Sequence, residues 1–205
     1  MERIPGRHVY RRARKYDANG FDSAFTNGAI RACSITGEVV MPVFSKFKQL
    51  IGFLGWLTSS FVAAAIGGFA SANAGDFYQQ LVRPEWAPPG WLFAPAWTLL
   101  YLLMAVASWL VWREGGFLKA RGALVPFLIQ LVANVAWTPI FFVFHLGAAA
   151  FAEILALWIL IAYTIIRFWH VRPLAAVLLL PYLTWVTFAS GLTYTIWQLN
   201  PTLLA

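Results

Sequence analysis

The amino-acid sequence predicts an all-α membrane protein, a bundle of five transmembrane helices with its N-terminus inside and its C-terminus outside. The 205 residues are 60% hydrophobic and only 11% charged, and their mean hydropathy is +0.68, outside the range of ordinary soluble domains. The apolar residues form runs close to the roughly 20 residues that a helix needs to cross a bilayer. The basic residues gather at alternate ends of these runs, which predicts the orientation.

Residues 1–45 differ in composition from the remainder and form a polar, basic N-terminal tail. They contain seven Arg or Lys and four Asp or Glu residues, and no apolar run follows closely enough to be the core of a signal peptide. We expect a disordered tail, followed by a transmembrane domain over residues 46–205. Two alternatives remain: translation could begin at Met41, or the tail could be a mitochondrial address, against which its acidic residues argue. We expect a bacterial cell membrane rather than an organelle membrane.

Five apolar runs follow the tail. Along the first run small residues recur at every fourth position, from Gly55 to Ser71, a pattern that lets helices approach closely and predicts helix packing or dimerisation. Between the first and second runs lies a long link, in which Pro84, Pro88 and Pro89 prevent one continuous helix. The predicted spans are approximately residues 50–72, 91–112, 122–144, 148–169 and 174–199.

The distribution of charge explains the formal net charge of +7. With the tail included, fourteen Lys and Arg residues precede or follow the spans on one side, against Arg83 alone on the other. This asymmetry places the N-terminus inside and makes the lipid bilayer, not nucleic acid, the expected partner of the basic ends. Cys33 is the single cysteine, and His145 and His170 stand alone in turns. The sequence therefore predicts no metal site and no required cofactor.

A polar stripe runs along the third span. Gln130, Asn134 and Thr138 are spaced four residues apart and so share one helical face. Polar groups at this depth need partners and often mark functional sites. Two interpretations are open: the stripe bonds neighbouring helices, or it lines a cavity. Glu153 is the single carboxylate within a span, and its position near a helix N-terminus suits a negative charge.

Three spans each place a tryptophan near mid-membrane, namely Trp97, Trp137 and Trp185. In the second span Tyr101 follows Trp97 by one turn, and in the fifth Ala189 follows Trp185. Membrane tryptophans commonly face lipid or pack between helices. If these three faces converge, however, they enclose a broad, flat-walled apolar cavity suited to a large planar ligand held by stacking.

Three blocks of sequence resemble those of a known family. They are RPEWAPPGWLFAPAWTLLYLLM (83–104), QLVANVAWTPIFF (130–142) and PYLTWVTFASGLTYTIWQLN (181–200). Together they are similar to the tryptophan-rich sensory protein / translocator protein family (TspO/MBR, peripheral-type benzodiazepine receptor), over roughly residues 48–200. The resemblance implies a five-helix bundle, usually a homodimer, that binds porphyrins and related tetrapyrroles. Members also bind sterols and synthetic isoquinoline or benzodiazepine ligands.

The resemblance also implies a set of ligand-binding residues. Glu153 falls where the family often has an acidic residue, and the segment at Pro88 and Pro89 resembles its lid. Thr193 stands where asparagine is frequent, and no basic residue follows Tyr194, as the family's sterol motif requires. The implied pocket residues are Tyr78, Trp97, Tyr101, Asn134, Trp137, Trp185 and Ala189.

Three functions are compatible with this reasoning. The first is a membrane receptor or sensor that binds porphyrins and regulates tetrapyrrole levels or a stress response. An enzyme that promotes light-dependent oxidative degradation of protoporphyrin is the second, with Trp97 and Trp185 as redox participants. The third is a transporter of tetrapyrroles or sterols, against which the chain lacks recognisable inverted repeats and a charged path across the membrane.

Overall fold

The structure is a computed structural model that describes residues 32–33, 39–40, 44–71 and 74–205. Within the tail it describes two short strands, β1 (Ala32–Cys33) and β2 (Val39–Val40), which pair antiparallel with Ala32 opposite Val40. Most of residues 1–45 therefore lies outside the described residues. The predictions of a disordered tail and of a start at Met41 fall there and stay predictions.

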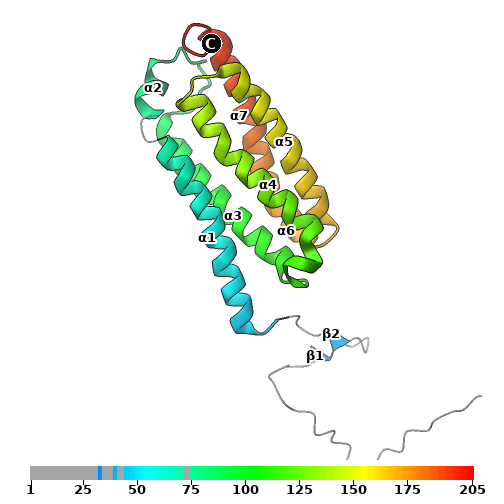
Figure 1. The fold of residues 1–205 in the computed structure, drawn as a ribbon. Coiled ribbons are helices and arrows are strands. Elements are labelled where there is room, and N and C mark those ends of the chain that lie inside the picture. Colours follow the sequence, from blue (N-terminus) through cyan, green and yellow to red (C-terminus); the bar gives the residue numbers. More distant parts are fainter. Residues whose placement is uncertain (1–31, 34–38, 41–43, 72–73) are drawn as a thin grey trace, which may run out of the picture. The chain divides into compact units, whose positions relative to one another are not determined.

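Helices make up the domain that follows. In the described part of the chain, five segments are long and apolar enough to cross a membrane: Lys46–Ala70, Gly90–Trp112, Gly116–Phe142, Gly147–Trp169 and Pro173–Leu199. They confirm the predicted fold of five transmembrane helices. The elements are α1 (Lys46–Ala70), α2 (Ala74–Gln80), the 3₁₀ turn η1 (Gly90–Leu92), α3 (Phe93–Trp112), α4 (Gly116–Phe142), α5 (Gly147–Trp169), α6 (Pro173–Leu178) and α7 (Leu180–Leu199) (Figure 1).

The structure differs from the prediction in the link and in the fifth span. The first half of the link, ahead of its prolines, forms the short helix α2. The fifth span is divided into α6 and α7 around Leu179. Pro181 has no N–H to donate, and its ring crowds the carbonyl of Val177 four residues earlier. The backbone therefore tightens, and Leu179 N donates to Ala176 O at 3.1 Å.

Helices that are distant in sequence pack side by side in the bundle. Helix α1 lies against α3 and α4, while α5 lies against α4 and α7 (Figure 1). Gly52 permits the close approach of α1 to α3, because a Cβ there would overlap the ring of Trp112. Nearby, Trp109 Nε1 donates to the carbonyl of Gln49 at 3.0 Å. Some of the small residues of α1 are thus explained by packing within one chain, and dimerisation stays a prediction.

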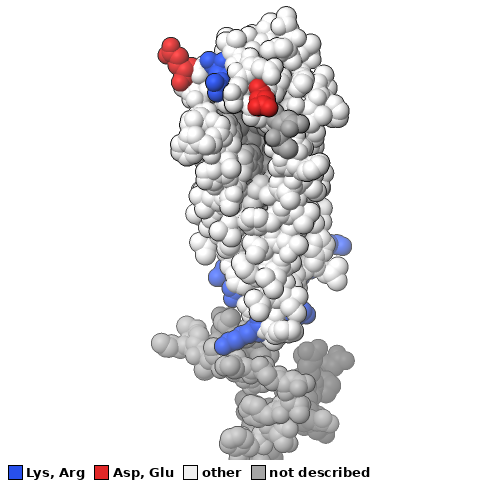
Figure 2. Space-filling model, turned by 90° about the vertical axis from the view of Figure 1, so that its left-hand side faces the viewer, with Lys and Arg blue, Asp and Glu red and all other residues white. Residues whose placement is uncertain are grey.

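Most of the basic residues visible in Figure 2 lie at one end of the bundle, whereas acidic and basic residues lie together at the other end. At the basic end Lys48 lies 4.4 Å from the ring centroid of Phe44, and Arg113 lies 4.9 Å from that of Trp109. Cations stacked on aromatic rings suit a membrane–water interface. This arrangement agrees with a bundle that spans the bilayer along its long axis, while the inside–outside orientation stays a prediction.

The orientation has a direct test, because Cys33 is the only cysteine of the chain. In spheroplasts, a membrane-impermeant maleimide is expected to leave Cys33 unlabelled until the cells are lysed. In a Cys33→Ala background, Leu203→Cys should instead be labelled in intact spheroplasts, because Leu203 lies at the opposite terminus and its side chain is 44% exposed. Labelling of Cys33 before lysis would show that the orientation is the opposite of the predicted one.

Candidate functional site

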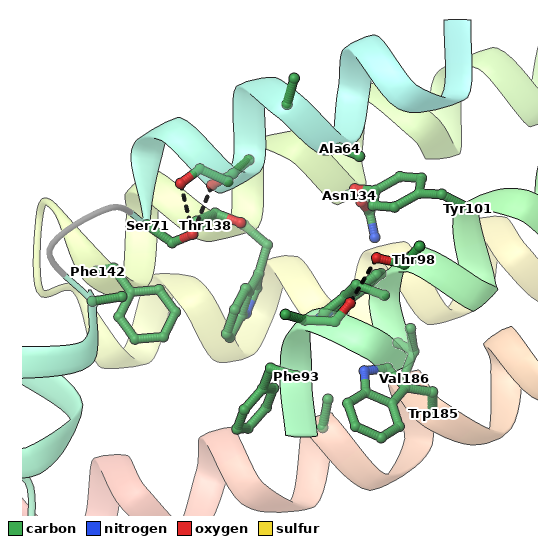
Figure 3. Close-up of a pocket in the computed structure, with 18 of the residues that line it drawn as sticks. Ala64, Ser71, Phe93, Thr98, Tyr101, Asn134, Thr138, Phe142, Trp185 and Val186 are labelled. Atoms are coloured by element: carbon green, nitrogen blue, oxygen red, sulfur yellow. Dashed lines mark hydrogen bonds between the residues drawn. The ribbon is translucent and has the colours of Figure 1, made fainter. Parts of the chain in front are cut away.

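A cavity of about 660 Å³ lies within the bundle, at the end that carries α2 and η1 (Figure 3). This volume falls within the range of ligand pockets. Helices α1, α3, α4 and α7 supply most of its walls, and α5 adds Ile154 and Leu157. The lining is apolar apart from a few hydroxyl, amide and indole groups, and the described residues that form it include no Lys, Arg, Asp or Glu.

All seven residues that the sequence predicted for a pocket lie around this one cavity. Trp97 and Trp185 meet edge to face, with ring centroids 6.5 Å apart and an interplanar angle of 80°. Tyr101 lies 5.7 Å from Trp97, measured between ring centroids. The three tryptophan faces converge on this cavity, which is the condition that the sequence reasoning left open, and binding by these residues stays a prediction. The seven are Tyr78, Trp97, Tyr101, Asn134, Trp137, Trp185 and Ala189.

A chain of buried hydrogen bonds fixes the closed side of the cavity. Tyr101 Oη donates to Asn134 Oδ1 at 2.5 Å, and Asn134 Nδ2 donates to Tyr182 Oη at 3.0 Å. Tyr182 Oη in turn donates to Gln130 Oε1 at 2.9 Å. These bonds join α3, α4 and α7. The polar stripe of the third span thus fulfils both interpretations, because Asn134 bonds neighbouring helices and also lines the cavity.

The predicted lid is tied to the cavity through Tyr78 of α2. Tyr78 Oη donates to the carbonyl of Pro88 at 3.3 Å, and the Tyr78 ring meets Phe93 edge to face at 5.8 Å. Burial raises the pKa of the Tyr78 phenol above its ordinary value, and the neighbouring Arg83 opposes that shift. Pro88 and Pro89 do not themselves line the cavity; Gly90, which follows them, does. Their role as a lid stays a prediction.

Several buried polar atoms have no hydrogen-bond partner among the described residues. They include Nε1 of Trp137 and Nε1 of Trp185, both on walls of the cavity, and both carboxyl oxygens of Glu153. A buried donor without a partner carries a cost in free energy, so such groups call for an explanation. The two indole N–H groups are available to a ligand in the cavity. Glu153 precedes the lining residue Ile154 and does not line the cavity itself.

Sequence reasoning missed several site residues, and two groups of them are instructive. Tyr182, which is fully buried, supports the cavity wall through Asn134. The available signal was its position three residues before Trp185, since a tyrosine at that depth needs a hydrogen-bond partner. The second group consists of small residues on and directly after α1, where the sequence predicted helix packing or dimerisation: Ala64, Ala65, Gly67, Gly68 and Ser71.

One side of the cavity is open between α1 and α3. Lining residues of both helices are also exposed on the outer surface of the bundle, among them Phe61 and Gly68 of α1 and Ala94 and Thr98 of α3. A hollow is visible on this side of the molecule in Figure 2. These positions belong to helices that are long and apolar enough to cross a membrane, so in a bilayer the opening would face lipid.

The fold and the site define a class: a multi-pass membrane protein of five helices with an aromatic cavity inside the membrane. Comparison with known proteins gives the particular family. Residues 53–198 match the model of the TspO/MBR family, and the chain belongs to that family.

Named relatives come from bacteria and animals. The chain is 41% identical over 137 residues to the tryptophan-rich protein TspO of Chlorobaculum tepidum, a match that covers 65% of this chain and 85% of the relative. It is 37% identical over 147 residues to protein CrtK of Rhodobacter capsulatus, covering 69% and 90%. The human translocator protein is 41% identical over 128 residues, covering 60% and 75%.

Proposed function

We propose that the protein is a membrane receptor or sensor that binds porphyrins and related tetrapyrroles in its aromatic cavity, and so regulates tetrapyrrole levels or a stress response. One observation carries the proposal: Trp97, Trp137 and Trp185 line a single cavity of about 660 Å³. Flat aromatic walls favour a flat ligand, because stacked rings gain contact area with little loss of conformational freedom.

Support also comes from the rigidity of the walls. Trp97 contacts Tyr101, Tyr182 and Trp185 through its ring, and the two tyrosines are fixed by the hydrogen bonds through Asn134. These side chains are therefore already ordered before a ligand binds, and binding does not have to reduce their conformational entropy. A ligand that matches the cavity gains affinity from such preorganisation.

Tryptophan fluorescence tests the proposal. Protoporphyrin is expected to quench the fluorescence of the purified protein saturably, because the ligand would lie beside several indole rings. Trp97→Phe and Trp185→Phe should each weaken binding by about tenfold, the effect of losing roughly 1–1.5 kcal/mol of aromatic contact. Trp158→Phe is a suitable control, because Trp158 is 37% exposed and lies outside the cavity. Unchanged affinity in both cavity variants would remove this site assignment.

The contact between Trp97 and Trp185 favours a second candidate function, the light- and oxygen-dependent degradation of a bound porphyrin. Indole rings beside a photo-excited porphyrin can be oxidised, which would make both tryptophans redox participants. Illumination of the protein with protoporphyrin in air is then expected to yield a new absorbing product. The same rate of formation with heat-denatured protein would eliminate this candidate.

A further inference from the structure

The described part of the cavity lining carries no formal charge. Its lining residues contain no Lys, Arg, Asp or Glu, and an ionised group transferred into such surroundings without a partner loses its hydration at a large cost. The available interior donors are neutral, namely Trp137 Nε1 and Trp185 Nε1. An ionised group on a ligand must therefore stay outside the apolar interior.

Among the described residues, Arg83 provides a cation next to this cavity. Its guanidinium carbon lies 4.8 Å from the centroid of the Tyr78 ring, and Tyr78 is itself a cavity wall. Among the described residues the single ion pair is Arg172–Glu114, so no described carboxylate neutralises Arg83. The Arg83 side chain is exposed. The Tyr78 ring thus separates the positive charge of Arg83 from the cavity.

The backbone beside Arg83 is fixed in place by Asn200 at the end of α7. Val82 N donates to Asn200 Oδ1 at 2.8 Å, and Asn200 Nδ2 donates to Val82 O at 2.9 Å. Asn200 Nδ2 also donates to the carbonyl of Ile196 at 2.8 Å, which anchors the amide to α7. Asn200 is only 4% exposed. These bonds hold the backbone of the link at Val82, next to the residue from which the Arg83 side chain extends.

We propose that Arg83 binds the carboxylate of a planar ligand whose ring system occupies the cavity, so that the ligand is an amphipathic acid with its charged edge towards α2. The proposal rests on the proposed function and adds the chemical class and the orientation of the ligand. A guanidinium is well suited to a carboxylate, because its planar N–H groups form two parallel charge-assisted hydrogen bonds.

A comparison of protoporphyrin with its dimethyl ester separates the contribution of the carboxylates to affinity from that of the macrocycle. Esterification removes both ionised groups and leaves the macrocycle unchanged. The full-length protein is titrated with each by tryptophan quenching, in a non-ionic detergent without phospholipid. The wild type is expected to bind the acid about tenfold more tightly than the ester, the effect of one charge-assisted hydrogen bond. Arg83→Gln should bring this ratio to about one by weakening the acid alone, and Arg83→Lys should retain part of it.

Arg113→Gln is the matched control, because Arg113 also stacks on an aromatic ring, that of Trp109, at the opposite end of the bundle. This variant should keep the wild-type ratio. Equal affinities for acid and ester in the wild type would overturn the inference and leave the proposed function intact. So would an unchanged ratio in Arg83→Gln, the result expected if Arg83 contacts only lipid phosphates. Failure of both porphyrins to bind the wild type would overturn the proposed function, and the inference with it.

Discussion

Ala189→Phe is expected to lower the affinity for protoporphyrin by about 100-fold, since an overpacked site costs on the order of 3 kcal/mol. Ala189 lines the cavity on α7, one turn beyond Trp185. Its methyl group leaves room beside the tryptophan, and a phenyl ring would occupy the volume that the ligand needs. Titration of purified protein by tryptophan quenching measures the loss.

The control for Ala189→Phe is Ala156→Phe, which adds the same ring to an exposed position of α5. Both variants should fold, because one ring enters a cavity and the other faces lipid. Only the cavity variant should lose affinity. Wild-type affinity in Ala189→Phe would show that the porphyrin binds elsewhere.

Asn134→Leu is expected to lower the free energy of unfolding by about 1–3 kcal/mol, the cost of leaving a buried polar group without its partner. Asn134 accepts from Tyr101 and donates to Tyr182. Without the amide, the Tyr101 hydroxyl loses its acceptor, while Tyr182 still donates to Gln130. Unfolding in a series of mixed micelles with increasing dodecyl sulfate measures the change.

A double-mutant cycle with Tyr101→Phe isolates this hydrogen bond. Tyr101→Phe removes the hydroxyl that Asn134→Leu would leave without a partner. Asn134→Leu should therefore lower the free energy of unfolding less in the Tyr101→Phe background than in the wild type. Hydrogen bonds between membrane helices average near 0.6 kcal/mol in such cycles, because the unfolded chain finds other partners. Strictly additive costs would show that the bond between Tyr101 and Asn134 contributes nothing to stability.

The transmembrane fold could be predicted because a bilayer imposes a length on each apolar run. The predicted fourth span began at Ala148, and α5 begins one residue earlier, at Gly147. The third span was less well placed: it was predicted from residue 122, whereas α4 begins at Gly116. Helix formation there extends into a polar segment with Lys119 and Arg121, because backbone hydrogen bonds do not depend on hydropathy.

The cavity could be predicted from aromatic residues and not from small ones. Trp97, Trp137 and Trp185 stood out because tryptophan at mid-membrane depth is unusual. Gly67 and Gly68, by contrast, carry a pattern that indicates close helix packing, and a sequence does not say whether the space beside a glycine is filled. At Gly68 an added Cβ would meet no atom within 4 Å. The missing side chain there leaves open space instead of admitting a neighbouring helix.

The opening between α1 and α3 makes the surrounding membrane a participant in binding. Phe61 and Gly68 on one helix and Thr98 on the other belong both to the cavity wall and to the lipid-facing surface. In a membrane, a ligand bound in the cavity would compete with any acyl chain that enters through this opening. The affinity of the same protein for a cavity ligand should therefore differ between detergents or lipids of different acyl-chain length.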